Sequence, residues 1–468
     1  MKVLGRLGLD PKRTRSLQTQ LSGQLRQLIQ AGDLEAGERL PSTRELAHDL
    51  QVSRNTIVAA YEMLVGEGYI QPHLRSGFQV CHAAQAFQKL AVSDRIPRER
   101  RIEPRQPAAP VPFRPTQPDV RLFSLQIWNR HRTLALKRGT SLLHYQSRFS
   151  VGLDELRQIV SAYLRASRGV RCQWQEVAIT NGSQQALFLL AHLLLKHGQT
   201  VYMEDPGYPG ARNAWEQAGA EVVPVPIDEE GLRLPEAQVT KPSLIYVTPS
   251  HQFPLGTCMS LARRLNLLQA ARTADAWIVE DDYDSEFRYT SPPQPSLQSL
   301  DEQRRVIYLG SFSKTLFPTL RLGYVVLPPA LVERFAALKS VADDHSPLID
   351  QATLSSFLES GAFYAHLRRC RRHYAERQEH FLQQVSRCGL PLQFPVTGRG
   401  MNLAGLLPEG SRDRLWSSRL KAAGLDVPPL SRYAIRPTAP GLLFGLAAFD
   451  TRSIQRGVAK MAQVFDMR

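Results

Sequence analysis

Cysteine is scarce in this chain, and the few cysteines form no pattern typical of a disulfide framework or a metal site. The five are odd in number, widely spaced and without a C-x-x-C pair: Cys81, Cys172, Cys258, Cys370 and Cys388. Secreted disulfide scaffolds and zinc sites use even or closely spaced sets instead. We therefore expect free thiols, a cytoplasmic location and no metal.

Long apolar runs are also missing. The longest, from Ala186 to Leu195, is too short to span a bilayer and is interrupted by His192. The first residues, Met1 to Arg6, lack the apolar stretch of a signal peptide. These absences predict a protein with no membrane partner.

The bulk composition is that of a globular protein with more than one domain. Hydrophobic residues make up 43% and charged residues 22% of the 468 positions, a length that exceeds what one core usually organises. The net charge is +15, and residues 1–115 contain 17 of the 58 basic but only 11 of the 43 acidic side chains. This denser basic excess mildly favours a polyanionic partner at the N-terminal end.

Residues 11–82 predict a small domain of three helices and a hairpin. Gly32 ends a first helical pattern, and Ser42 with Glu45 forms a capping box that opens a second. The helices are expected over 16–31, from Ser42 and from Ser53, with Ile57, Met63 and Leu64 on the apolar side of the third, and the strands over 69–71 and 77–80 around a basic tip at 73–75. Helices followed by such a hairpin indicate a winged helix.

The first turn of the third helix has the side chains that read DNA. Arg54, Asn55 and Thr56 are of the types that reach phosphates and base edges from a helix N-terminus in the major groove. Arg44 is expected to grip the flanking backbone. The candidate DNA-binding residues are Ser42, Thr43, Arg44, Ser53, Arg54, Asn55, Thr56 and Gly77. Use of the winged helix for protein contact is the alternative.

Residues 83–118 differ sharply in composition from their neighbours. Prolines between 97 and 118 alternate with arginines between 95 and 114. Such a segment predicts an extended, semi-rigid linker that packs into no core. A solvated tether and a specific contact with DNA are both open readings of its arginines.

Residues 119–468 show short apolar runs separated by helical patterns. The expected strands are 177–180, 200–203, 244–247, 277–279 and 306–309. This alternation predicts an α/β domain with a mainly parallel sheet and helices on its faces.

Chemically distinctive residues follow several of these strands. Lys314 lies between Ser311, Ser313 and Arg321, which are suited to hold an aldehyde cofactor that carries a phosphate: the amine forms a Schiff base, and the hydroxyls and guanidinium bind the phosphate. Asp281 belongs to an acidic run at another strand end. Ligands bind at that carboxyl edge in open α/β sheets.

These motifs resemble two known families. Residues 40–70 resemble a GntR-type winged helix, and roughly residues 115–468 resemble fold-type I aminotransferases. With Thr248-Pro249-Ser250-His251-Gln252-Phe253-Pro254 and the run 280–289, the whole chain resembles a MocR/GabR-type regulator of the GntR superfamily. The resemblance implies pyridoxal 5′-phosphate (PLP) as cofactor, double-stranded operator DNA as partner and a homodimer.

The resemblance also assigns roles to individual residues. Lys314 would form the aldimine, Asp281 would contact the pyridine nitrogen and Tyr283 the ring hydroxyl. The remaining cofactor-binding candidates are Gly182, Ser183, Gln184, Tyr208, Ser311, Ser313 and Arg321, with Tyr145 reaching the phosphate site of the partner subunit.

Two departures from the aminotransferase pattern bear on function. Phe253-Pro254-Leu255-Gly256 stands where those enzymes have Asn-Pro-x-Gly, and no arginine precedes the late apolar run 442–446. Arg432 and Arg436 are the candidates to bind an effector instead. We therefore expect a regulator that senses PLP, an amine or an amino acid. The alternatives are a working aminotransferase with a DNA-binding appendage, and a regulator whose large domain mainly dimerises.

Overall fold

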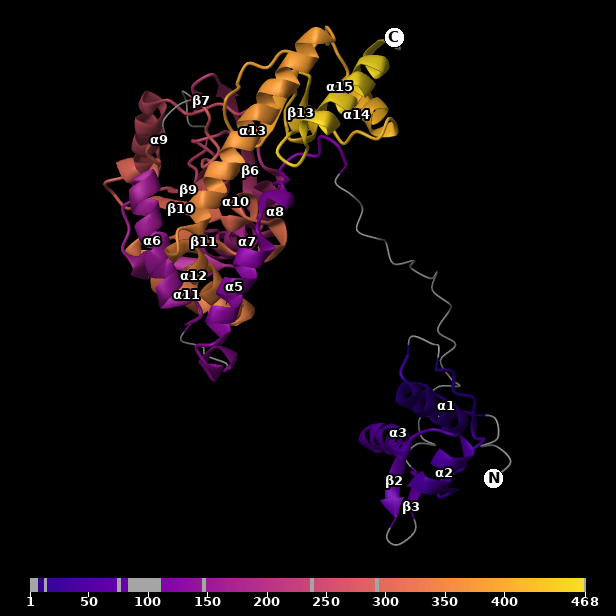
Figure 1. Ribbon diagram of the computed structural model, residues 1–468. Helices are drawn as coiled ribbons and strands as arrows, with labels where there is room; N and C mark the ends of the chain where they lie inside the picture. The colour runs from indigo at the N-terminus through magenta and orange to yellow at the C-terminus, as the bar shows by residue number, and fades with distance from the viewer. Residues whose placement is uncertain are drawn as a thin grey trace. The chain divides into compact units, whose positions relative to one another are not determined.

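The computed structural model describes residues 7–11, 15–73, 77–82, 111–144, 149–235, 240–290 and 294–466. The chain divides into two compact units, residues 1–107 and 108–468, each with its own hydrophobic core (Figure 1). Within the described ranges, no helix combines the length and the apolar character needed to cross a membrane.

The first unit is a winged helix. Its elements are α1 (Leu17–Ala31), β1 (Arg39–Leu40), α2 (Thr43–Asp49), α3 (Arg54–Gly66), β2 (Ile70–His73) and β3 (Gly77–Val80). The antiparallel strands lie in the order β1-β3-β2. The predicted helices and hairpin are present, and the two-residue strand β1 is an addition because so short a segment has no readable periodicity.

Side-chain caps fix the points where these helices begin. Ser16 and Ser53 each accept a bond from the backbone N–H three residues on, and Ser42 with Glu45 forms a reciprocal capping box. Each cap satisfies a backbone N–H that has no partner inside its helix. Gly32, at φ 83°, ends α1 in the left-handed conformation that glycine adopts readily.

The core of the first unit differs from the prediction at one position. Ile57 and Leu64 are fully buried, as predicted, whereas Met63 is 36% exposed. Tyr61 is fully buried instead, and its hydroxyl donates to the carbonyl of Pro41 at 3.0 Å. This bond ties α3 to the start of α2.

The second unit is built on an eight-stranded sheet of order β4-β11-β10-β9-β8-β5-β6-β7. The strands are β4 (Val177–Thr180), β5 (Thr200–Asp205), β6 (Glu221–Asp228), β7 (Gly231–Leu232), β8 (Leu244–Val247), β9 (Trp277–Asp282), β10 (Val306–Ser311) and β11 (Gly323–Val326). All five predicted strands are present, while β6, β7 and β11 are not among the predictions.

Strand direction brings the candidate residues to one edge. β5, β6, β8, β9 and β10 are parallel, and β4 points the same way because both β4 and β10 pair antiparallel with β11. The carboxyl ends of β4, β9 and β10 therefore meet at one side of the sheet. Residues just before β11 lie there too, because that strand runs in the opposite direction.

Helices cover the sheet and lead to a smaller C-terminal part. They are α5 (Leu125–Leu136), α6 (Asp154–Arg168), α7 (Ser183–Leu194), α8 (Pro209–Gln217), α9 (Leu261–Ala274), α10 (Phe312–Thr315), α11 (Pro329–Asp343), α12 (Leu348–Glu359), α13 (Ala362–Arg387), α14 (Asp413–Ala422) and α15 (Thr451–Asp466). The long helix α13 runs from the sheet to the end of the unit where α14, α15 and β13 gather (Figure 1). There β12 (Asn402–Leu406) pairs antiparallel with β13 (Gly441–Gly445).

The last residues of the expected linker pack against this C-terminal part. Phe113 is fully buried among Phe381, Phe444 and Phe449. Gly445 allows this approach, because a Cβ there would collide with the carbonyl of Arg114. The prediction that nothing in residues 83–118 packs into a core is therefore wrong for Phe113, since one aromatic side chain is enough to anchor an otherwise polar segment.

Two ion pairs hold the same segment. Arg114 pairs with Asp426 at 2.6 Å, and the buried Asp119 pairs with Arg377 at 2.8 Å. Burial acts to raise the pKa of Asp119, but hydrogen bonds from Arg121 and Arg377 outweigh it and leave the pKa lowered. Residues 111–119 thus belong to the second unit.

Replacing the aromatic anchor tests this docking. Phe113→Ala should lower the free energy of unfolding of the second unit by about 3–5 kcal/mol, because it opens a cavity in a closed aromatic cluster. All five tryptophans lie beyond residue 107, so urea unfolding followed by tryptophan fluorescence reports this unit alone. Phe188→Ala is the control, since Phe188 is 47% exposed. Equal midpoints for the two variants would contradict the account.

Candidate cofactor pocket and DNA-binding face

Lys314 lies where the sheet edge predicts it. It follows β10 within the short helix α10, whose start is capped by the side chain of Ser311. Its ammonium donates to the carbonyl of Thr116 at 2.9 Å. Burial lowers the pKa of Lys314, against the opposing charges of Asp284 and Asp281. A lowered pKa increases the share of neutral amine, which is the nucleophilic form.

Asp281 lies in β9, the strand that pairs with β10 before Lys314, and only one of its two carboxylate oxygens has a hydrogen-bond partner among the described residues. One oxygen, Oδ2, accepts a 2.7 Å bond from the hydroxyl of Tyr246, while the buried Oδ1 has no hydrogen-bond partner among the described residues. Burial raises the pKa of Asp281 to about 7, although Tyr246 and Lys314 act in the other direction. An oxygen in this state fits a protonated ring nitrogen, which would supply both a hydrogen bond and a charge.

Candidate phosphate ligands converge from three segments. Gly182 caps α7, and a Cβ on it would lie 3.1 Å from the guanidinium of Arg321. Arg321 in turn donates to the carbonyl of Asn181 at 3.0 Å. The hydroxyl of Ser313 is buried without a hydrogen-bond partner in the described structure. A guanidinium, a free hydroxyl and the amide end of a twelve-residue helix are together suited to a phosphate.

Aromatic side chains form the walls beside this anchor. Tyr208 immediately precedes α8 and meets Phe253 edge-on at 5.8 Å between ring centroids. Phe253 also meets Tyr283 and Tyr433 edge-on, at 5.9 and 5.2 Å. The position occupied by asparagine in the aminotransferase pattern is thus part of an aromatic cluster and has no side-chain donor.

The starts of α7 and α8 pack closely together. Gln184 donates to the carbonyl of Gly210 at 2.9 Å, and a Cβ on Gly210 would collide with both Gln184 and Tyr208. Ser183 is the first residue of α7. These candidates are therefore neighbours in space, although Gln184 is mainly exposed and already bonded.

A pocket of about 670 Å³ opens in front of Lys314. Arg432 lines it, as predicted for an effector contact, but Arg436 lines a different pocket, and its backbone N–H bonds to Asp205. The proposal that Arg436 contacts the same ligand as Lys314 is therefore not supported. Arg212 of α8 also lines the pocket and is not among the residues predicted from sequence. Tyr145 lies outside the described residues.

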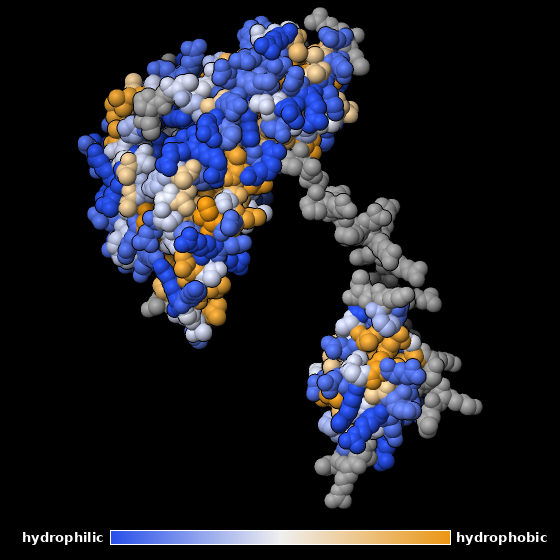
Figure 2. Space-filling model, viewed as in Figure 1, coloured by the Kyte–Doolittle hydropathy of each residue, from blue (hydrophilic) through white to orange (hydrophobic). Residues whose placement is uncertain are grey.

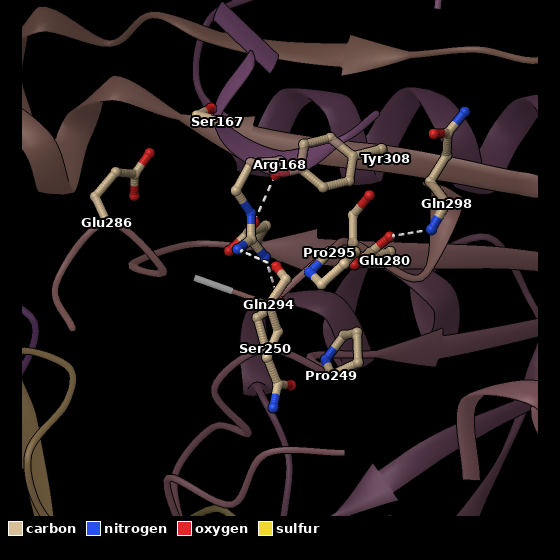
Figure 3. A network of polar contacts seen from close by, with 12 residues as sticks. Ser167, Arg168, Pro249, Ser250, Glu280, Glu286, Gln294, Pro295, Gln298 and Tyr308 are labelled. Carbon is tan, nitrogen blue, oxygen red and sulfur yellow. Dashed lines mark hydrogen bonds and ion pairs between the residues drawn. The ribbon is translucent and has the colours of Figure 1, made fainter. Parts of the chain in front are cut away.

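A buried arginine supports the acidic end of β9. Arg168 bonds Asp282 at 2.8 Å, the hydroxyl of Ser250 at 2.5 Å and the carbonyl of Gln294 at 2.8 Å. Figure 3 shows its guanidinium directed towards Ser250, with Tyr308 alongside. Burial acts to raise the pKa of Asp282, but the charge of Arg168 together with hydrogen bonds from Ser285, Tyr308 and Arg168 leaves the pKa lowered. Arg168 therefore pairs with the carboxylate of Asp282 and makes no bond to the neighbouring Asp281.

The candidate DNA-binding residues lie together on the winged helix. Arg44, Arg54 and Asn55 are exposed, and Arg54 approaches the hydroxyl of Thr43 at 3.4 Å. Ser42 and Ser53 cap α2 and α3, so their hydroxyls act first as structural caps. The helix-turn-helix geometry thus presents two exposed arginines at adjoining helix starts. Gly77, exposed at φ 90°, opens β3, and residues 74 and 75 of the expected tip lie outside the described residues.

The pocket residues fit PLP on observations within the structure. Asp281 has an unbonded oxygen, Ser313 has an unbonded hydroxyl, and Gly182 leaves space beside a guanidinium. Each is a buried polar or backbone feature that a phosphate-bearing pyridine would complete. Tyr246 and His251, which touch Asp281 and Tyr283, were not among the sequence candidates.

Comparisons with known families agree with this two-part organisation. Residues 17–80 match the family described as "Bacterial regulatory proteins, gntR family", and residues 133–442 match "Aminotransferase class I and II". The probable rhizopine catabolism regulatory protein MocR of Rhizobium meliloti is 38% identical over 98% of this chain and 96% of its own length. The pyridoxine biosynthesis transcriptional regulator PdxR of Corynebacterium glutamicum is 30% identical, over 98% of both proteins.

A solved structure shows the same fold in the second unit. The α-aminoadipate aminotransferase LysN of Thermus thermophilus, in complex with N-(5′-phosphopyridoxyl)-L-leucine, is 30% identical with a TM-score of 0.69. The match covers 76% of this chain and 92% of LysN. With a relative at 38% identity along nearly the whole chain, this protein belongs to the MocR-type regulators of the GntR superfamily, in which a gntR-family DNA-binding domain precedes an aminotransferase class I and II domain.

Proposed function

We propose that this protein is a transcription regulator that binds PLP through Lys314 and operator DNA through the winged helix. The observation that carries the proposal is that the Lys314 amine lies at the same sheet edge as a buried Asp281 oxygen that has no hydrogen-bond partner among the described residues. When bound, PLP supplies an aldehyde that reacts with amines and an electron-withdrawing ring. Asp281 would hold a proton at the ring nitrogen, and Tyr208 would cover the ring.

A second set of groups in this site would bind the phosphate of PLP. Arg321, Ser311 and Ser313, together with the amides that follow Gly182, would hold it. Arg321 is already oriented by the carbonyl of Asn181 at 3.0 Å. A guanidinium fixed before binding loses less entropy on binding, so this arrangement favours retention of the cofactor.

The pocket supports sensing better than rapid turnover. Phe253 places a phenyl ring where aminotransferases have an asparagine, and its neighbours Tyr208 and Tyr433 are aromatic. One orienting hydrogen bond to the ring hydroxyl is thereby lost, and orientation can account for several kcal/mol of a reaction barrier. We therefore favour regulation over efficient transamination.

The effector is PLP itself or an amine or amino acid that enters the pocket. Arg212 and Arg432 line that pocket, and neither has an ion-pair partner among the described residues. Arg114, by contrast, is paired with Asp426. Two unpaired guanidinium groups near an amine-reactive centre favour a ligand with an anionic end.

Thr116 connects Lys314 to the segment that follows the linker. Its carbonyl accepts the Lys314 amine, and its φ of 61° is a left-handed conformation that a β-branched residue rarely adopts. A lysine engaged with PLP has its nitrogen directed towards the cofactor. We propose that this competition shifts the conformation of residues 111–119, and so the tether to the DNA-binding unit, as a population bias.

A homodimer completes the proposal. Apolar patches interrupt the hydrophilic surface of the second unit in Figure 2. The exposed apolar side chains on and after α5 are Leu125, Ile127, Leu134, Leu136 and Leu143. Clustered exposed leucines favour burial against a second copy, and a dimer would present two winged helices to paired half-sites. A monomeric mass by light scattering would contradict this part of the proposal.

Loss of the lysine tests PLP binding. Purified full-length protein mixed with PLP should develop visible absorbance, and borohydride reduction should leave the cofactor mass on the peptide that contains Lys314. Lys314→Ala should abolish both signals, because the described residues that line the pocket include no other lysine. The exposed Lys196→Ala is the matched control. An unchanged spectrum in Lys314→Ala would rule out the assignment.

Loss of an arginine at the start of α3 tests DNA binding. Arg54→Ala should weaken operator binding by about 1–3 kcal/mol if the side chain contacts a base edge. Arg26→Ala is the control within the same unit, because Arg26 is already engaged with Glu67. Operator fragments can be obtained by sequencing genomic DNA retained by the protein. Normal binding by Arg54→Ala in a gel shift would overturn the helix-turn-helix assignment.

A further inference from the structure

The buried side chains of His251 and Asp284 lie next to Tyr283, and neither is assigned a contact with the cofactor. The Nδ1 atom of His251 lies 2.7 Å from Oδ1 of Asp284 and 3.0 Å from the hydroxyl of Tyr283. His251 is 6% exposed and Asp284 is 1% exposed. The imidazole and the phenol are also stacked, with an interplanar angle of 27°. The three side chains therefore form one packed unit.

The surrounding backbone leaves the imidazole little room to move. A Cβ on Gly400 would clash with the ring of His251, and a Cβ on Gly256 would lie 3.2 Å from its Nε2. Both glycines have positive φ, 69° and 83°, which a side chain would strain. Asp284 is itself held, because its Oδ2 accepts the backbone N–H of Met401 at 3.2 Å. The orientation of His251 is thus fixed from several sides.

This geometry determines which partner can donate. A carboxylate only accepts hydrogen bonds, so the contact with Asp284 requires the proton on Nδ1 of His251. The hydroxyl of Tyr283 cannot then donate to Nδ1. It can at most accept a weaker, shared hydrogen bond from the Nδ1–H group of His251. The phenol proton is left available for another acceptor. Burial raises the pKa of Tyr283 well above its usual value, with Asp284 adding to the shift, so the phenol keeps its proton at neutral pH.

Tyr283 lies beside a wall of the pocket. Its ring meets Phe253, which lines the pocket in front of Lys314. Phe253 itself can donate nothing to the hydroxyl of a cofactor ring. With PLP bound as proposed, Tyr283 would be the donor on this side of the ring and would depend on His251 for orientation.

We propose that His251, held by Asp284, is a positioning residue that commits the phenol of Tyr283 to donate to the ring hydroxyl of bound PLP. The pair offsets the hydrogen bond that is lost at Phe253. This inference rests on the proposed cofactor site. It differs from a simple packing role because it requires the effects of His251 and Tyr283 on the cofactor to be coupled.

A double-mutant cycle in the full-length protein tests the coupling. The variants are His251→Leu, Tyr283→Phe and their combination, and the readouts are the dissociation constant of PLP and the pH at which half of the visible band changes form. Each single change should weaken PLP about tenfold, the effect of one hydrogen bond to a charged or polarised group. The double variant should be no weaker than the singles, because the two residues act as one unit.

Two further variants separate positioning from stability. His251→Asn keeps a donor near the place of Nδ1 and should restore most of the affinity and the pH midpoint. Asp284→Asn keeps the shape but weakens the hold on His251, so it should reproduce the midpoint shift. His131→Leu is the matched control, since His131 is buried on α5 and bonds Ser356.

The outcomes are distinguishable. A double variant weakened by about a hundredfold would mean independent effects and would overturn the proposal. So would a wild-type dissociation constant and midpoint in His251→Leu, or, if that variant does not fold, in Asp284→Asn. Failure of the wild-type protein to bind PLP would instead overturn the proposed function.

Discussion

Three consecutive buried carboxylates at the end of β9 are the constraint around which the second unit is organised. Glu280 accepts the backbone N–H groups of Leu297 and Gln298, and Asp282 is paired with Arg168. Of these three acids, only Asp281 has an oxygen without a hydrogen-bond partner in the described part of the chain. Burying a charge without partners costs several kcal/mol, so two of these acids are bonded within the protein and the third is left for a ligand. The position of that third acid, beside Lys314, defines the site.

Much of this site could be predicted because parallel strands bring their carboxyl ends together. Once strands were expected before Asn181 and Lys314, the residues after them had to be neighbours. Arg321 could be assigned from its spacing to Lys314, and the antiparallel strand β11 explains why it returns to the same edge. The capping serines of the winged helix could be predicted equally well, because a capping box such as Ser42 with Glu45 depends only on residues close together in the sequence.

Other features depend on contacts that no local pattern encodes. Tyr246 lies inside a strand, so only the register of β8 against β9 brings it to Asp281. Strand β6 contains Pro224 and Pro226, which remove ladder donors and mask it in sequence. Phe113 is hidden within a proline-rich segment, and only the three-dimensional fold of the C-terminal part shows what it packs against. The exposed Arg436 is a sequence candidate only because it is close to Arg432 in the chain, and in the structure it lines a different pocket.

PLP bound at Lys314 is proposed to change the affinity of the winged helix for DNA. The most direct test of this claim is the affinity of the full-length protein for a selected operator fragment, measured at fixed salt with and without PLP. Salt must be fixed because phosphate contacts make binding steeply salt-dependent. We predict that PLP changes the affinity of the wild-type protein and leaves that of Lys314→Ala unchanged. Equal operator affinity with and without PLP in the wild-type protein, when its visible absorbance shows that PLP is bound, would contradict the claim.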